Sequence, residues 1–260
     1  MIIAGRSISN GKARGKVLRL KEPFSFLGGV DGSTGELKVE DGGNVSGRIF
    51  VFPRGKGSTV GSFTMYDLKV HGKHPSAVIN SSAETIVATG AVISSIPMVD
   101  SVDVELLRNG DDVTVDGSNG KINIHNVKKI KCVSSAVYVN GKILMLKRPD
   151  NASSFPGVWS LVAGKIEKNE SPDYAAKREI FEETGLRVKK HSASLKPILV
   201  REDNVIWEVF PYIFVHDGTD VKLNMENIEH KWVLPADMHK LNTVTSTLSA
   251  VKELLSKVTP

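Results

Sequence analysis

The chain has 260 residues, a single cysteine and a formal net charge of +5. One cysteine excludes a disulfide framework and indicates a reducing cytoplasm, and no apolar run is long enough for a secretory leader or a transmembrane helix. The charge is divided between the halves, +1 over residues 1–127 and +4 over residues 128–260, so a nucleic-acid-binding stripe is not expected.

Residues 1–127 are predicted to form the first of two domains. They contain short β-like segments separated by glycine-rich turns, among them Asp31-Gly32, Asn109-Gly110 and Asp116-Gly117. The composition changes near residues 126–130, where a short polar segment connects the two halves. The domain boundary is therefore predicted between residues 127 and 128.

The segment with the most chemical information in this domain is the sequence FVFPRGKGSTVGS, residues 50–62. An apolar strand is expected to lead into a loop that contains Arg54, Lys56 and Ser58, after which Ser62 caps a helix. The backbone amides at the start of that helix, with two cations nearby, predict an anion site. The spacing does not match a Walker loop.

Together with three other stretches, this segment resembles the small subunit of the aconitase-X family, in particular the archaeal phosphomevalonate dehydratases. The other stretches are residues 28–31, 83–91 and 96–100. The resemblance covers nearly the whole domain and implies a swivelling β/β/α domain that closes over a larger subunit. In that family, the larger subunit carries an iron–sulfur cluster and a serine of the small subunit accepts a proton.

By its position in the motif, the proton-accepting serine corresponds to Ser62, with Ser58 as the second choice. Arg54, Lys56 and Ser58 are then expected to bind the substrate, and nearby positive charge would lower the pKa of the serine hydroxyl. The implied reaction removes water from 5-phosphomevalonate to give an anhydromevalonate phosphate. The alternative is that Ser62 only caps its helix, the commonest role of a serine there.

The chain cannot hold the iron–sulfur cluster itself, because Cys132 is its single cysteine and a cluster needs several thiolates. Cys132 lies in an apolar run and is expected to be a small buried residue. A [4Fe–4S] cluster is therefore expected in a separate large subunit, without which the domain could not dehydrate its substrate. The alternative for this half is an assembly domain.

Residues 128–260 are predicted to form the second domain. Two apolar runs flank Asn140-Gly141 within residues 131–147, which predicts a β-hairpin. Residues 205–215 predict an apolar, aromatic strand, and leucines and valine at helical spacing over residues 248–255 predict a C-terminal amphipathic helix.

Residues 164–186, GKIEKNESPDYAAKREIFEETGL, contain a predicted helix with acidic residues on one face. Ser171 as N-cap and Pro172 at the first helical position predict its start, and Gly185 predicts its end. Three carboxylates fall at i, i+3 and i+4, so they share one face and repel one another: Glu179, Glu182 and Glu183. Mg²⁺ or Mn²⁺ would relieve that repulsion and would also bind a diphosphate.

These residues match the Nudix signature at every fixed position, and from Ser134 onward the chain resembles the Nudix hydrolases, which cleave diphosphates linked to another group. The resemblance implies an α/β/α sandwich and a metal site formed by the carbonyl of Gly164 and by Glu170, Glu179, Glu182 and Glu183. Arg178 is expected to orient the glutamates. Water would attack phosphorus with the help of the metal, with Glu182 favoured as the base and Glu226 or Glu229 as alternatives.

Four aromatic residues are candidates for stacking on a substrate ring: Trp159, Trp207, Phe210 and Tyr212. Trp159 is favoured, because the others lie in a predicted strand with buried neighbours and binding residues are more often on loops. The alternative is that each is a core residue. Phosphorylated small molecules are the expected substrates, with nucleotide diphosphates favoured, and the fusion adds isoprenoid diphosphates as a hypothesis.

The alternative for the second domain is a non-catalytic ligand sensor or docking module. Such modules commonly lose glutamates of the signature, and this chain has all of them. We therefore predict a two-domain α/β enzyme with Mg²⁺ or Mn²⁺ in its second half. The expected partners are phosphorylated small molecules and a separate large subunit, with no nucleic acid and no membrane.

Overall fold

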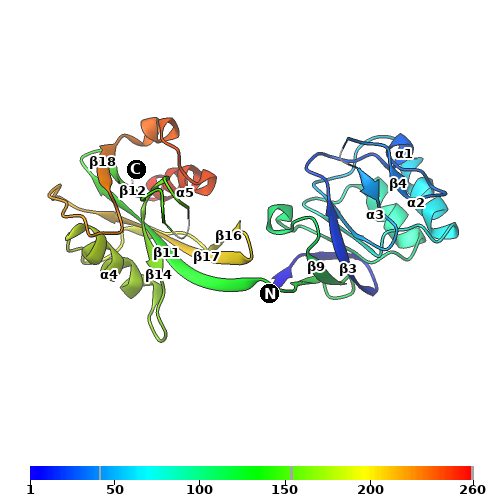
Figure 1. Cartoon of the computed structure of the whole chain (residues 1–260), viewed down its shortest axis with the longest axis horizontal. Helices are drawn as coiled ribbons and strands as arrows, with labels where there is room; N and C mark the ends of the chain where they lie inside the picture. The colour runs from blue at the N-terminus through cyan, green and yellow to red at the C-terminus, as the bar shows by residue number, and fades with distance from the viewer. Residues whose placement is uncertain (41, 153–154, 259–260) are drawn as a thin grey trace. The chain divides into compact units, whose positions relative to one another are not determined.

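The computed structural model describes residues 1–40, 42–152 and 155–258 of the chain (Figure 1). The chain divides into two compact units, Met1–Lys128 and Lys129–Pro260. The predicted boundary lies one residue before this division. Within the described residues, no helix is both long enough and apolar enough to cross a membrane.

Eight strands form the mixed sheet of the N-terminal unit, in the spatial order β1 (Ile2–Ala4), β10 (Lys121–Ile124), β9 (Asp112–Asp116), β3 (Lys12–Arg19), β6 (Ile49–Phe52), β7 (Ala77–Asn80), β8 (Met98–Asp100) and β2 (Arg6–Ser9). The run from β3 to β8 is parallel and the outer pairs are antiparallel. Every residue of β6 and β7 is buried, as expected for parallel strands covered on both faces. A separate short ladder pairs β4 (Glu36–Leu37) with β5 (Gly43–Asn44).

The helical elements of this unit are α1 (Phe26–Gly29), α2 (Gly61–Val70), α3 (Thr85–Ile93) and the 3-10 helix η1 (Val104–Leu106). α2 and α3 pack against each other and bury Met65, Leu68 and Val87 against the sheet. Four phenylalanine rings pack in the same core with centroids 4.8 to 6.0 Å apart: Phe24, Phe26, Phe50 and Phe52. The helix that the sequence predicts at the end of the 50–62 segment is present as α2.

The connection between the two units is short. β10 is followed by His125, whose amide still donates a hydrogen bond to the carbonyl of Asp112 at 2.9 Å. β11 (Lys128–Val139) then begins at the boundary, so only residues 126 and 127 lie between these two positions. The segment predicted as a polar linker therefore already contains the first residues of a strand.

The C-terminal unit has a second eight-stranded sheet, whose main path runs through β13 (Trp159–Ser160), β12 (Lys142–Lys147), β11, β17 (Val205–Val215) and β15 (Ala193–Ser194). Three further strands extend it, since β14 (Val162–Lys165) pairs with β11, β16 (Ile198–Glu202) with β17, and β18 (Glu229–Val233) with β12. The predicted hairpin joins β11 to β12. Its turn residues, Asn140 and Gly141, have φ angles of 48° and 82°, as a type I′ turn requires.

Two α-helices lie on opposite sides of this sheet, α4 (Pro172–Thr184) and α5 (Thr245–Leu255), with the 3-10 helix η2 (Pro235–Lys240) beside α5 (Figure 1). Alternate residues of β11 face the two layers, because Val137 packs with Ile180 of α4 and Ala136 packs with Val251 of α5. This arrangement is the α/β/α sandwich that was predicted.

A buried carboxylate holds one edge of the N-terminal sheet. The side chain of Asp100 is 1% exposed, and its two oxygens accept hydrogen bonds from Nε and Nη2 of Arg6 at 2.8 and 2.6 Å. The backbone amide of Ala83 donates a third bond at 2.9 Å. The carboxylate therefore joins β2, β8 and the segment before α3, and removing its charge would leave donors facing one another.

We expect Asp100→Asn to destabilise the N-terminal unit by about 2 kcal/mol, because the amide group places its own N–H among donors in a buried position. Calorimetry of the full chain should show a lower melting temperature for one of two transitions. Asp112→Asn is the matched control, since Asp112 forms the same two-bond pair with Arg14 at an exposed position. Equal decreases in melting temperature in both variants would contradict the proposed stabilising role of the buried Asp100 carboxylate.

Candidate active site

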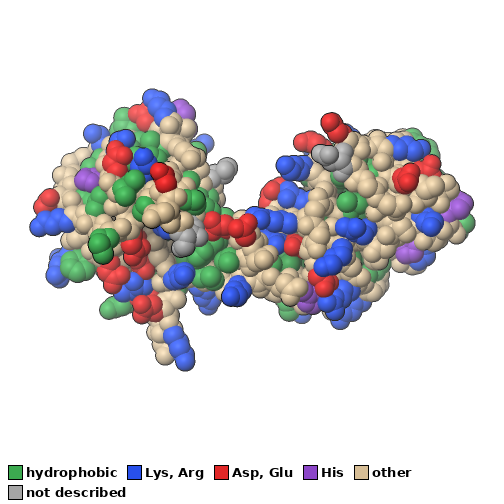
Figure 2. All heavy atoms as spheres, viewed as in Figure 1, with side chains coloured by type: hydrophobic (Ala, Val, Ile, Leu, Met, Phe, Trp, Pro, Cys, Tyr) green, Lys and Arg blue, Asp and Glu red, His purple; other side chains and the backbone are tan. Residues whose placement is uncertain are grey.

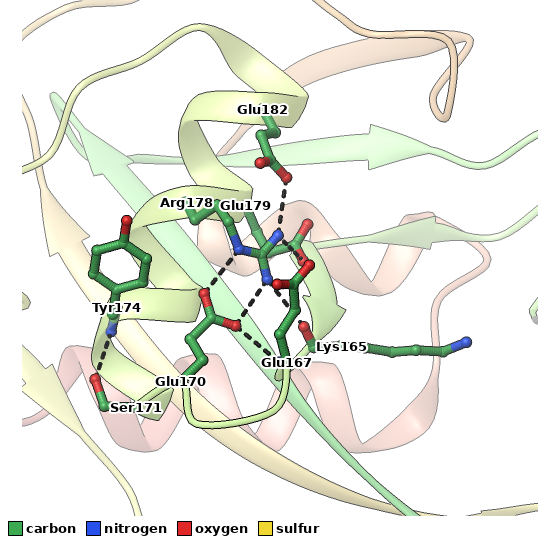
Figure 3. Close-up of polar contacts among 8 residues, drawn as sticks. All are labelled: Lys165, Glu167, Glu170, Ser171, Tyr174, Arg178, Glu179 and Glu182. Carbon is green, nitrogen blue, oxygen red and sulfur yellow. Dashed lines mark hydrogen bonds and ion pairs between the residues drawn. The ribbon is translucent and has the colours of Figure 1, made fainter.

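Arg178, on α4, lies at the centre of a network of carboxylates (Figure 3). Its Nε and Nη2 donate to the two oxygens of Glu170 at 2.8 and 3.0 Å, and its Nη1 donates to Glu179 and Glu182 at 2.8 and 2.9 Å. Nη2 also donates to the carbonyl of Lys165 at 3.0 Å. The guanidinium lowers the pKa of Glu170 by hydrogen bonding. Three of the predicted metal residues thus converge on one cation.

The local sequence explains why α4 presents these residues. Ser171 accepts a hydrogen bond from the amide of Tyr174 at 3.2 Å, and Pro172 occupies the first helical position. Gly185 ends the helix with a φ of 71°, a left-handed conformation that glycine adopts without strain. Helical spacing then places residues 179 and 183 on the inner side of α4 and residue 182 outside, where its side chain is 51% exposed.

Gly164 on β14 lies against the carboxylate of Glu179. A β carbon at this position would overlap with the Glu179 carboxylate, so glycine is what allows the acid to approach the strand. Glu179 is nearly buried, and burial raises the pKa of its carboxyl, with smaller contributions of the same sign from the charges of Glu182 and Glu226.

Glu183 is bonded to groups outside the Arg178 network. One oxygen accepts a hydrogen bond from the amide of Ala163 at 3.2 Å, and the other accepts one from Nδ2 of Asn227 at 2.6 Å. Burial raises the pKa of Glu183 to about 8. Asn227 was not predicted, because its role depends on a contact between residues 44 positions apart, and its only sequence signal is its proximity to Glu226.

The glutamates do not form a ready-made metal cage, since no group of three or more His, Cys, Asp or Glu side chains among the described residues is arranged to hold an ion. The reason is that Arg178 takes up Glu170, Glu179 and Glu182, while Glu183 is bonded to Asn227. The chemistry of the donors nevertheless fits a hard divalent cation. All of the donor atoms are oxygens and they are close together. The summed negative charge of the carboxylates exceeds the single positive charge of the Arg178 guanidinium.

A cavity of about 420 Å³ opens beside this network. Its wall includes Gly164, Glu179 and Glu182, and also Glu226, but not Glu229, which pairs with Lys231 on β18. Much of the remaining described lining is apolar or aromatic, including Phe155, Val158, Leu161, Val200, Trp207 and Val209. The rest is polar and includes three basic residues, Arg148, Lys165 and Arg178. Acidic and apolar surfaces therefore meet in one cavity, as a substrate with a charged and an uncharged end would require.

The four aromatic candidates are placed differently. Trp207 lines the cavity, whereas Trp159 begins β13 and packs in the core on the α5 side, with Nζ of Lys231 4.7 Å from its ring centroid. Phe210 and Tyr212 belong to the core on the α4 side. Phe155 also lines the cavity and was not among the predicted site residues. Its backbone has a φ of 46°, a conformation that the sequence does not indicate.

In the N-terminal unit, Arg54, Lys56 and Ser58 are exposed on the loop between β6 and α2, whereas Ser62 is buried. Figure 2 shows Lys and Arg side chains spread over the visible face of this unit rather than gathered at one place. The close approach of Gly55 to Glu84, the residue that caps α3, ties this loop to α3.

The prediction that Ser62 caps α2 is wrong. The N-cap position is Val60, and Ser62 lies in the first turn, where its hydroxyl donates to the carbonyl of Thr59 at 2.8 Å. Ser58 is the residue whose oxygen accepts from a backbone amide, that of Val60, at 3.3 Å. The chain begins its helical turn at residues 59 and 60, so a serine predicted just outside the helix lies inside it.

Comparisons with known proteins match each half separately. A family model described as the aconitase X swivel domain matches residues 2–124, and one described as the NUDIX domain matches residues 130–253. The phosphomevalonate dehydratase small subunit of Thermococcus kodakarensis is 52% identical over 128 residues, 48% of this chain and 96% of that protein.

Solved structures match the same halves. The holo-form of aconitase X from Thermococcus kodakaraensis is 52% identical and covers 48% of this chain and 98% of its own, with a TM-score of 0.47. The MutT protein of Methanosarcina mazei Go1 is 23% identical and covers 52% of this chain and 98% of its own, with a TM-score of 0.44.

We expect Asn227→Ala to destabilise the C-terminal unit by about 2 kcal/mol, because it leaves the buried Glu183 carboxylate without one of its two donors. Calorimetry of the full chain at about pH 9, above the raised pKa of Glu183, measures the effect on the ionised carboxylate. Asn204→Ala, at an exposed turn position, is the control and should leave the melting temperature nearly unchanged. A melting temperature of Asn227→Ala equal to that of the control would contradict this role.

Proposed function

Because the chain belongs to the aconitase X swivel family through residues 2–124 and carries a NUDIX domain over residues 130–253, we propose that it joins two activities on phosphorylated small molecules. The C-terminal unit would be a Mg²⁺- or Mn²⁺-dependent hydrolase that cleaves a diphosphate, with nucleotide diphosphates as the favoured class. The N-terminal unit would be the small-subunit part of a hydro-lyase.

The observation that carries the hydrolase proposal is the convergence of Glu170, Glu179 and Glu182 on Arg178 beside a cavity with a partly apolar wall. Glu170, Glu179, Glu182, Glu183 and the carbonyl of Gly164 would hold the cation. When bound, Mg²⁺ would supply charge stabilisation on the diphosphate and a water of lowered pKa. Arg178 would keep the carboxylates in place through its fixed set of N–H donors.

Glu182 is the proposed general base. Its side chain is 51% exposed and keeps one oxygen outside the Arg178 contact, so water can reach it. Glu226 is the alternative because it also lines the cavity. In either case the carboxylate would accept a proton from the water that attacks phosphorus.

The N-terminal unit would act with a separate large subunit that carries a [4Fe–4S] cluster. This part of the proposal is supported by the name of the relatives, which are small subunits of a phosphomevalonate dehydratase, and by the single cysteine of this chain. Arg54, Lys56 and Ser58 would bind the phosphate of 5-phosphomevalonate. Ser62 would accept the proton as an alkoxide, so its hydroxyl would first have to lose the proton that it donates to the Thr59 carbonyl. Ser58 is the alternative.

Glu182→Gln is expected to lower Mg²⁺-dependent hydrolysis by about 100-fold or more, because the amide cannot accept a proton. A panel of nucleoside triphosphates, ADP-ribose, dinucleotides and isoprenoid diphosphates should be assayed with the full chain. Glu253→Gln, at an exposed position on α5, is the matched control.

One preferred substrate, cleaved by the control and not by Glu182→Gln, would support the hydrolase. No cleavage of any member of the panel by the unaltered chain would favour a ligand sensor instead. Equal rates in Glu182→Gln and the control would move the proposed base to Glu226.

Ser62→Ala is expected to reduce dehydration of 5-phosphomevalonate by about 100-fold, since the proton acceptor is removed. The assay requires the full chain co-expressed with a cluster-bearing aconitase X large subunit, and product is measured by mass spectrometry. Ser58→Ala is the comparison, and it should weaken substrate binding more than turnover. Full loss in Ser58→Ala with activity retained in Ser62→Ala would reverse the two roles.

A further inference from the structure

We propose that Glu202 is a positioning residue of the C-terminal cavity, whose carboxylate holds Phe155 and Trp207 as two aromatic walls for a flat ring of the substrate. The inference rests on the proposed hydrolase function of the same site and specifies the part of the substrate that lies beyond the diphosphate.

The carboxylate of Glu202 is divided between the two aromatic residues. One oxygen accepts a hydrogen bond from the backbone amide of Phe155 at 3.0 Å, and the other accepts one from Nε1 of Trp207 at 3.2 Å. Phe155 lies 47 residues before Glu202 and Trp207 lies five residues after it. A single side chain therefore links two parts of the cavity wall that belong to different segments.

The strand register places Glu202 on the cavity side of the sheet. β16 and β17 are antiparallel neighbours, with Val200 opposite Trp207 (Figure 1). Side chains two positions apart on a strand share a face, so Glu202 lies on the same face as Val200. Val200 and Trp207 both line the cavity. The acid is thus beside the substrate space, at the end of β16, and not on the opposite face of the hairpin.

The conformation of Phe155 gives its hydrogen bond a specific task. Its φ of 46° lies in the left-handed region, which a bulky residue seldom adopts and which persists only when neighbouring contacts hold it. The bond from its amide to a charged carboxylate is such a contact. Without Glu202, the backbone of Phe155 would be free to return to an ordinary conformation and move its ring.

The bond to Trp207 determines which surface of the indole faces the ligand. The indole has one polar atom, the Nε1–H donor, and Glu202 satisfies it. The ring therefore offers its apolar surface to the cavity, beside Val200 and Val209. Two aromatic walls with apolar neighbours suit a planar aromatic group such as a nucleobase better than a flexible aliphatic chain.

The test uses ADP as a ring-bearing probe and inorganic pyrophosphate as a probe without a ring. Glu202→Gln keeps one acceptor oxygen and loses the second, so the dissociation constant for ADP should rise about tenfold while that for pyrophosphate stays the same. Quenching of tryptophan fluorescence by ADP should be lost in Trp207→Phe, which assigns the signal to this indole. Glu208→Gln is the control, since Glu208 lies on β17 and pairs with Lys129.

A double variant separates positioning from simple destabilisation. If Glu202 acts through Trp207, then Glu202→Gln should weaken ADP binding less in the Trp207→Phe background than alone, whatever the melting temperature. Unchanged ADP binding in a folded Glu202→Gln would overturn the inference, as would equal losses for ADP and pyrophosphate or failure of every nucleotide to bind. If the unaltered chain and its variants bind ADP and pyrophosphate as expected but the unaltered chain hydrolyses no substrate, the result would count against the proposed hydrolase and not against the role of Glu202.

Discussion

The C-terminal site depends on one guanidinium group. Glu170, Glu179 and Glu182 carry like charges within reach of one another, and without a cation between them their repulsion would oppose both the end of α4 and the loop before it. Arg178 compensates them with N–H donors in a fixed plane and uses one further bond to hold the carbonyl of Lys165. The helix, the loop and β14 thereby keep a common geometry.

Both units use a glycine to admit a carboxylate to the backbone. In the C-terminal unit, Gly164 leaves room for Glu179, and in the N-terminal unit Gly55 leaves room for Glu84. Each glutamate belongs to a helix or its cap: Glu84 caps the start of α3, and Glu179 lies on the inner side of α4. In each case the missing side chain of one residue determines where the charge of another can lie.

Local signals predicted the elements well, and tertiary contacts account for what was missed. Ser171, Pro172 and Gly185 predicted the limits of α4, since caps and breakers act over one turn of chain. The same logic failed at Ser62, because the chain entered its helical turn two residues earlier. Asn227 and Phe155 were missed, because the role of each comes from a partner in another segment, Glu183 and Glu202 respectively. The preference for Trp159 followed from its expected loop position, whereas the structure puts it in a strand and in the core.

The two-residue connection between His125 and β11 has a consequence for how the halves are supplied in the cell. Two separate polypeptides can be made in unequal amounts and can diffuse apart, but residues 126 and 127 span only about 7 Å even when fully extended. Every copy of the swivel domain therefore arrives with one copy of the NUDIX domain, in a ratio that expression levels cannot change. Any partner that binds the first domain would also bring the second to the same place.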